Sequence, residues 1–334
     1  MRKRTLGVDG PELSVIGLGT WAIGGGDWPF GWGAQDEQVA VDAIVRAVDL
    51  GINWIDTAAV YGFGKSEQLV GRALKQFAAA DRPLIATKCG RVDLGNGEIG
   101  KSLTRSSIIS ECEASLERLH VECIDLYQMH WPEPDEQIEE GWETLLELQK
   151  QGKVRYVGVS NHSADQMKRL QAIGQIQSSQ PPYSIISGDA EQGVLPFCAA
   201  NGIGVVCYSP MGKGLLTGAF DANRAKTLAD NDHRCRDPRF QSPQLEINLN
   251  LIESLRKIAI GLGWSMAELA IAWVLRREEV TSAIVGSRSP EQIEQTATAG
   301  NRELDASTLN EVNQFIEAWK KDLTAIEGVE RARV

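Results

Sequence analysis

Four side chains near predicted strand ends could together protonate a carbonyl oxygen. Asp56, Lys88 and His130 each end a short apolar run, and Tyr61 lies on the glycine-flanked turn that follows Asp56. A phenol titrates near 10, which is high for an acid at neutral pH. A neighbouring cation lowers such a pKa, so Lys88, held by Asp56, is expected to make Tyr61 more acidic. His130 could bond a substrate oxygen or relay a proton. No side chain donates hydride, so the set predicts a reduction that uses a cofactor.

Other polar side chains have the right chemistry to hold a nicotinamide cofactor. Ser160, Asn161 and Gln180 end two further apolar runs and suit a carboxamide, and Tyr208 offers a flat face to a nicotinamide ring. The segment SPMGKGLLTG, residues 209–218, follows a predicted strand. Its glycines and its lysine could wrap a pyrophosphate.

The segment GSRSPEQ, residues 286–292, ends a predicted strand and opens a helix whose N-terminal amides favour an anion. Arg288 in this segment would favour a 2′-phosphate, and hence NADPH over NADH. Two simpler readings remain open. Arg288 could be a solvated surface charge, and Gln292 could serve only to complete a capping box with Ser289.

The elements that must position these residues alternate between apolar runs and amphipathic helices, which predicts a parallel sheet. Eight strand-then-helix units favour a closed (β/α)8 barrel, formed by residues 1–334 as one domain. A β-hairpin over residues 4–16 precedes it, and three long connections, 20–36, 91–104 and 211–247, are expected to serve function. The strands are expected at 13–20, 52–57, 84–88, 124–130, 154–161, 176–180, 202–210 and 281–288.

The composition narrows the classes of function. The net charge of −11, without a basic block, argues against nucleic acid or an anionic membrane as a partner. No apolar run approaches the roughly 18 residues of a membrane span. The N-terminal MRKRTLGVDG has no apolar core behind it and is not a secretory signal. The six cysteines are scattered without a CxxC, which predicts a reducing, cytoplasmic compartment.

Some patterns are interpreted as structural. Gly17 and Gly19 match a loose dinucleotide fingerprint, but no helix follows them and no acid stands about 20 residues later at a strand end. No metal site is predicted, because the remaining histidines lack metal-ligand spacing and are assigned to the surface: His120, His162 and His233.

Aromatic residues gather in the connection over 20–36 and directly after His130. Trp21, at a strand end, and Trp131 are the candidates for an apolar wall of the substrate pocket. Core packing is the alternative for any of the aromatics in this group, which also includes Trp28, Phe30 and Trp32.

The motifs, taken together and in order, resemble the aldo-keto reductase family along essentially the whole chain. The likeness is greatest to the bacterial branch, which has a YGFG-SE turn and an HWP segment. The resemblance implies a (β/α)8 barrel that binds NADP(H) without a Rossmann fold. The motifs are INWIDTAAVYG, LIATK, IDLYQMHWP, VRYVGVSN, QPPYS, YSPMGKGLLTG and IVGSRSPEQIEQ.

The resemblance also implies roles. Tyr61 would be the proton donor, and Asp56, Lys88 and His130 would complete the tetrad. One departure concerns Gln295-Thr296, which stands where many members carry Glu-Asn to hold the adenine: Gln still offers an amide oxygen, and Thr is a poorer substitute. The other implied cofactor contacts are Ser160, Asn161 and Gln180 at the carboxamide, Tyr208 under the nicotinamide, Ser209, Met211, Gly212, Lys213 and Leu215 along the pyrophosphate, and Gly286, Ser287, Arg288 and Gln292 towards the 2′-phosphate.

The predicted function is the NADP(H)-dependent, reversible reduction of a small aldehyde or ketone. A second hypothesis keeps the barrel and the cofactor but makes the chain a sensing or regulatory subunit with little turnover. A metal-dependent hydrolase built on Asp56 and His130 is a poor third, because it needs more acidic and histidine ligands at the strand ends.

Overall fold

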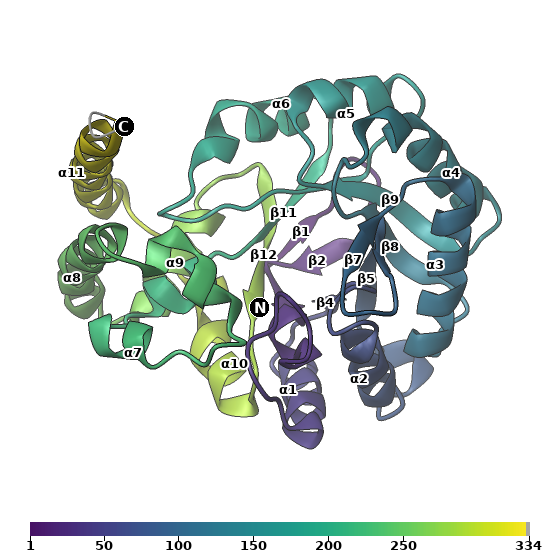
Figure 1. Cartoon of the computed structure of the whole chain (residues 1–334), viewed down its shortest axis with the longest axis horizontal. Helices are drawn as coiled ribbons and strands as arrows, with labels where there is room; N and C mark the ends of the chain where they lie inside the picture. The colour runs from purple at the N-terminus through teal and green to yellow at the C-terminus, as the bar shows by residue number, and fades with distance from the viewer. Residues whose placement is uncertain (332–334) are drawn as a thin grey trace.

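Eight parallel strands close into a barrel in the computed structural model, which describes residues 1–331 (Figure 1). The strands follow one another around the ring in chain order, as expected for strand–helix units with right-handed connections. The predicted (β/α)8 barrel is therefore confirmed. Its strands are β3 (Ile16–Gly19), β4 (Trp54–Asp56), β5 (Leu84–Cys89), β8 (Ile124–Met129), β9 (Val154–Ser160), β10 (Ser178–Gln180), β11 (Gly204–Tyr208) and β12 (Val280–Gly286).

Helices surround the ring (Figure 1). Two long ones were not predicted: α8 and α11 pack against each other beside the barrel. The helices are α1 (Glu37–Asp49), α2 (Lys65–Leu74), α3 (Arg105–Leu119), α4 (Ile138–Lys150), α5 (Ala164–Gln171), α6 (Val194–Ala200), α7 (Ala222–Lys226), α8 (Gln244–Leu262), α9 (Met266–Leu275), α10 (Pro290–Ala297) and α11 (Ala306–Arg331).

Side-chain caps set several helix starts. Asp36 accepts a hydrogen bond from the Val39 amide at the start of α1. Capping boxes begin α5 at Ser163 and α9 at Ser265. The helix α2 begins at Lys65 without a side-chain cap, and the Ser66 side chain in its first turn is buried among other hydroxyls.

Two small hairpins stand outside the barrel ladder. The predicted N-terminal hairpin is formed by β1 (Lys3–Thr5) and β2 (Glu12–Ser14), with Lys3 paired to Ser14. The connection over 91–104 carries a second, unpredicted hairpin of β6 (Arg91–Asp93) and β7 (Ile99–Lys101).

The interior of the barrel is a small apolar core, separate from the large core between the strands and the helices. Leu6 and Leu13 of the N-terminal hairpin pack into it against Trp54, Leu126 and Ile284. The hairpin therefore closes one end of the barrel, and the polar strand ends gather at the other.

Gly17 has a structural role, as the sequence suggested. A Cβ at this position would lie 2.1 Å from the nearest ring atom of Trp54. The indole is itself fixed, because its Nε1 donates to Ser14 O and to Ser282 Oγ at 3.2 and 3.0 Å. The missing side chain at Gly17 therefore makes room for the indole inside the barrel.

No single helix in the described part of the chain is long and apolar enough to cross a membrane. Helices α8 and α9 reach the required length and composition when taken together, but they are bent by 91° where they meet.

Replacing Gly17 with alanine should destabilise the fold. The added methyl group collides with a hydrogen-bonded indole, and overpacking of this kind costs about 1–3 kcal/mol, occasionally more. Urea unfolding measures the change. Gly261→Ala is the matched control, because Gly261 lies in α8 with no neighbour within 4 Å of the new methyl group and should gain a little stability. Equal unfolding midpoints for the two variants would contradict the account of Gly17.

Candidate active site

Asp56 and Lys88 form a buried ion pair at the open end of the barrel. Their exposed fractions are 3% and 1%, and Lys88 Nζ lies 2.7 Å from Asp56 Oδ2. The ammonium also donates to Thr57 O at 2.8 Å. Burial lowers the pKa of Lys88, and the contacts with Asp56 oppose that shift. Because isolated charges are costly to bury, each group depends on the other to remain ionised here.

Tyr61 stands next to this pair, as predicted, but its acidity was predicted with the wrong sign. Lys88 Nζ lies 3.5 Å from the hydroxyl oxygen, at the limit of a hydrogen bond. Burial, followed by the negative charge of Asp56, raises the pKa of Tyr61 well above its usual 10.0. The ammonium, held by Asp56, does not outweigh the loss of hydration, so the phenol keeps its proton.

His130 completes the group of four. Its ring centroid lies 5.8 Å from that of Tyr61, with the two planes 76° apart. Burial, and then the positive charges of Lys88 and Arg91, hold the pKa of His130 well below its usual 6.5. The imidazole is therefore neutral, with one nitrogen that can donate and one that can accept.

A cluster of buried hydroxyls holds the turn that carries Tyr61. Thr20 Oγ1 donates to Asp56 O at 2.9 Å, and Ser66 Oγ donates to Thr20 Oγ1 at 2.8 Å. Ser66 Oγ also lies 2.9 Å from Thr57 Oγ1, and the Ser66 amide donates to Tyr61 O at 3.1 Å. The phenol and the carboxylate are thus fixed to one network, which explains a serine inside the first turn of α2.

The residues predicted to hold a carboxamide lie together at neighbouring strand ends. Asn161 Oδ1 accepts from the Tyr208 hydroxyl at 2.8 Å, and Ser160 Oγ donates to Gln180 O at 2.9 Å. The Gln180 side chain donates through Nε2 to Asp56 Oδ1 at 2.8 Å. That last contact crosses the barrel mouth and was not predicted.

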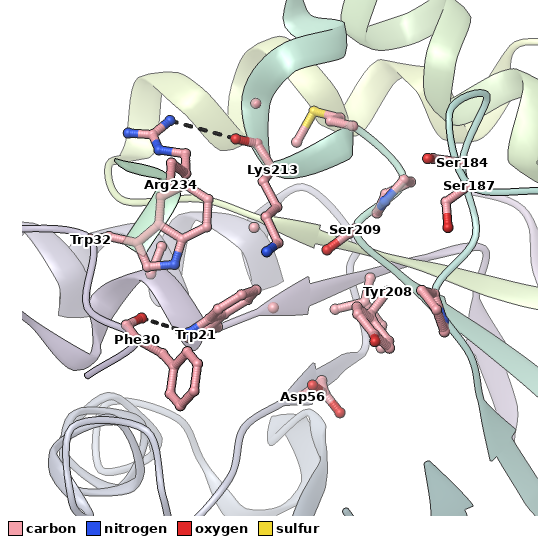
Figure 2. A pocket seen from close by; sticks show the side chains of 18 of the residues that line it. Trp21, Phe30, Trp32, Asp56, Ser184, Ser187, Tyr208, Ser209, Lys213 and Arg234 are labelled. Carbon is pink, nitrogen blue, oxygen red and sulfur yellow. Dashed lines mark hydrogen bonds between the residues drawn. The ribbon is translucent and has the colours of Figure 1, made fainter. Parts of the chain in front are cut away.

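A cavity of about 1210 Å³ opens above these residues. In Figure 2, Trp21 and Trp32 lie on one side of it and Tyr208 and Ser209 on the other, with Lys213 extending between them. The cavity exceeds the 300–1,000 Å³ of an ordinary ligand pocket, so it has room for a cofactor and a substrate. Its aromatic wall includes both predicted pocket residues and is made of Trp21, Trp28, Phe30, Trp32 and Trp131.

The glycine-rich segment after β11 lies along the cavity, but two of its residues that were predicted to contact the cofactor do not line it. Ser209, Met211 and Lys213 line the cavity. Gly212 and Leu215 are buried beneath them, so any contact from these two residues would come from the backbone.

The long connection after β11 also contributes charged residues that the sequence reasoning missed. Asp237 Oδ2 lies 3.0 Å from Lys213 Nζ and accepts from Arg239 at 2.6 Å. Arg234 binds both carboxylate oxygens of Asp232. The side chains of Lys213, Arg234 and Arg239 all line the cavity. The alternation of Asp and Arg in DHRCRDPRF was the available signal, but an irregular segment gives no period that assigns a face.

Two histidines assigned to the surface are buried, so that prediction is wrong. The His233 ring lies 4.7 Å from the Trp21 ring and 4.8 Å from the Trp32 ring. Burial lowers the pKa of His233 to about 4 and that of His162 to about 4. Only His120 is exposed, as expected.

At the far end of the cavity, Arg288 contacts the connection over 20–36. Its Nε donates to Gln35 Oε1 at 2.8 Å, its Nη1 to Trp32 O at 2.9 Å, and its Nη2 to Ala34 O. A guanidinium carries five N–H donors, so two of them remain for an anion.

The capping box predicted for Ser289 and Gln292 is not formed. Gln292 Oε1 accepts from the Arg288 amide at 2.9 Å instead of from the cap residue. Ser287 is buried and donates to Ser289 O at 2.8 Å. Besides Arg288, the residues of this region that line the cavity are Gly286, Gln292, Gln295 and Thr296.

These surroundings fit a nicotinamide dinucleotide. Lys213, Arg234 and Arg239 line the cavity, and their three positive charges exceed the two negative charges of their partners Asp232 and Asp237, which suits a pyrophosphate. The amides that open α10 provide a second anion-binding end. Among residues 1–331, no three His, Cys, Asp or Glu side chains gather closely enough to hold a metal ion.

Comparisons with known proteins agree with this geometry. The family model described as "Aldo/keto reductase family" matches residues 15–317. The chain is 38% identical to the aldo-keto reductase YhdN of Bacillus subtilis (92% of this chain, 91% of that protein), and 35% identical to the NADH-specific methylglyoxal reductase of Escherichia coli (95% and 100%). It superposes on the glycerol dehydrogenase AKR11B4 of Gluconobacter oxydans with a TM-score of 0.84, at 36% identity over 94% of each chain.

The ion pair leads to a stability prediction. Lys88→Met leaves the Asp56 carboxylate buried and unpaired, so it should lower the free energy of unfolding by about 3–5 kcal/mol. The double variant Lys88→Met/Asp56→Asn should recover part of that loss, because no net charge stays buried. Urea unfolding measures all three proteins.

The control for this prediction is a second lysine–carboxylate pair on the surface. Lys153 pairs with Glu113, both are partly exposed, and Lys153→Met should cost less than about 1 kcal/mol. If Lys88→Met is no more destabilising than this control, the interdependence of Asp56 and Lys88 is refuted.

Proposed function

Because the chain belongs to the aldo/keto reductase family, we propose that it uses NADP(H) to reduce aldehydes and ketones reversibly, with Tyr61 as the proton donor. The observation that carries the proposal is the group at the barrel mouth. A protonated phenol, a neutral imidazole and a paired ammonium all stand at the same end of one cavity. That combination is suited to a carbonyl oxygen that gains charge and then a proton.

The proposed mechanism divides the work among these residues. The bound nicotinamide supplies the hydride that the carbonyl carbon takes up. Tyr61 gives its proton to the carbonyl oxygen, and His130 bonds the same oxygen. An alkoxide is a stronger base than a phenolate, so the transfer runs downhill even with the raised pKa of Tyr61. Lys88 then stabilises the phenolate until it takes a proton from water, and the net reaction consumes one proton.

The substrate is proposed to be a small aldehyde or ketone, or the corresponding alcohol in the reverse direction. The aromatic wall can hold an apolar substituent, and the polar groups near His130 can hold the oxygen. Two similar proteins carry names that refer to small polar substrates, methylglyoxal and glycerol. A panel of aldehydes and ketones, followed by the loss of NADPH absorbance, tests this proposal.

NADP(H) is proposed as the preferred cofactor because Arg288 keeps two N–H donors at the end of the cavity beside the start of α10. The Escherichia coli relative is named an NADH-specific enzyme, so membership of the family does not decide between NADPH and NADH. We also propose that the protein works in the cytoplasm, where its six reduced cysteines would persist.

Tyr61→Phe should lower kcat for carbonyl reduction by a factor of about 10²–10⁴, the usual contribution of a general acid, and should leave the cofactor Kd unchanged. Cofactor binding is followed by quenching of tryptophan fluorescence. The control is Tyr156→Phe at the opposite end of the barrel, which should retain full activity. Undiminished turnover in Tyr61→Phe would show that another group donates the proton.

The wild-type kcat for reduction should be flat between about pH 7 and about pH 10, because His130 has already lost its proton below that range and Tyr61 keeps its proton throughout. A decline of kcat within this window would show that one of the two pKa shifts has the wrong sign.

Arg288→Met should raise the KM for NADPH more than the KM for NADH, since only NADPH carries the phosphate. Charged hydrogen bonds contribute roughly 1.5–3 kcal/mol, so the NADPH/NADH preference should fall at least about tenfold. Gln35→Ala removes both hydrogen bonds between Gln35 and Arg288 but keeps the cation, so it should preserve the preference. If Arg288→Met leaves the ratio of the two KM values unchanged, Arg288 does not recognise the phosphate.

A further inference from the structure

The Asp56 carboxylate is held on both of its oxygens. Oδ2 accepts from Lys88 at 2.7 Å, and Oδ1 accepts from Gln180 Nε2 at 2.8 Å. All three residues are buried, with exposed fractions of 3% for Asp56, 1% for Lys88 and 2% for Gln180. The second contact connects β10 to β4, two strands that are not neighbours in the barrel. It is therefore a bond across the barrel mouth and does not follow from strand pairing.

The chemistry of the carboxylate fixes the orientation of the Gln180 amide. A carboxylate only accepts hydrogen bonds, so the amide nitrogen must face Asp56. The carbonyl oxygen, Oε1, then lies on the other side of the amide. Gln180 lines the cavity, and no side chain or backbone group in the described part of the protein donates to Oε1. This oxygen is a free acceptor at the cavity wall.

The other two residues predicted to hold a carboxamide are already engaged. Asn161 Nδ2 donates to His130 O at 2.9 Å and to Ser160 Oγ at 3.0 Å, and Asn161 Oδ1 accepts from Tyr208. Ser160 Oγ donates its proton to the backbone oxygen of Gln180. Within this set, the side-chain oxygen of Gln180 is the acceptor without a protein donor in residues 1–331.

We propose that Gln180 is a positioning residue that couples the cofactor carboxamide to the proton donor. Its Oε1 accepts an N–H of the carboxamide, and its Nε2 donates to Asp56, which holds the Lys88 ammonium beside Tyr61. An amide that accepts a hydrogen bond at its oxygen becomes a stronger donor at its nitrogen, so the two hydrogen bonds of Gln180 strengthen each other. The inference rests on the proposed cofactor, and it assigns Gln180 a second task besides binding it.

The coupling has a measurable consequence for binding. If the two bonds of Gln180 strengthen each other, its contribution to cofactor affinity depends on the charge of Asp56, because a hydrogen bond to a charged acceptor is about twice as strong as one to a neutral acceptor. The coupling is reciprocal: if the charge of Asp56 strengthens cofactor binding, the bound cofactor strengthens the hydrogen bond between Gln180 and Asp56.

A double-mutant cycle on the cofactor Kd tests the coupling without requiring turnover. NADPH binding is followed by tryptophan fluorescence for wild type, Gln180→Met, Asp56→Asn and the double variant. Gln180→Met should raise the Kd about tenfold in the wild-type background and less than about threefold in the Asp56→Asn background. Asn161→Ala is the matched control, because it touches the same ligand group without touching Asp56 and should act equally in both backgrounds.

Turnover adds a second, separable measurement. At saturating cofactor, Gln180→Met should still reduce kcat about tenfold, because excess cofactor cannot restore the lost contact with Asp56. Gln180→Leu serves in place of Gln180→Met if the latter does not fold, as judged by circular dichroism.

Equal effects of Gln180→Met on Kd in both backgrounds would overturn the coupling, and so would a kcat that is fully restored by excess cofactor. An unchanged Kd would show that Oε1 does not contact the cofactor. If wild type binds NADPH and shows the non-additive cycle but turns over no carbonyl, the proposed function fails while the coupling stands.

Discussion

The site depends on one interaction, the ion pair between Asp56 and Lys88 inside the mouth of the barrel. Two charges are removed from water there, and each is kept ionised by the other. The ammonium is then a fixed positive charge next to a phenol that keeps its own proton. In the mechanism proposed above, the ammonium stabilises the phenolate after the proton has been transferred, and the phenol is not acidic beforehand.

The barrel supplies the rigidity that this pair requires. Parallel strands bring their carboxyl ends to one rim, so residues far apart in the chain meet there without long loops. Buried hydroxyls from three segments tie the Tyr61 turn to β4, and the N-terminal hairpin closes the opposite end. The side chains at the rim are thus held in place by hydrogen bonds and by core packing inside the barrel.

Much of this arrangement could be predicted from the sequence, and the reason is geometric. Asp56, Lys88 and His130 end apolar runs, and ends of parallel strands must converge. The raised pKa of Tyr61 could not be predicted, because it depends on how completely the phenol is buried. The bond from Gln180 to Asp56 spans non-adjacent strands, and Arg234 and Arg239 lie in an irregular segment where no periodicity assigns a face.

The contact between Gly17 and Trp54 also constrains how this sequence can diverge. The indole occupies the volume that a side chain at position 17 would need, and its two hydrogen bonds prevent it from turning aside. Neither position can therefore drift alone: a larger residue at 17 becomes acceptable only after the tryptophan has been exchanged for a smaller one. Epistasis between these two sites should appear among distant descendants as paired exchanges of size across the barrel interior.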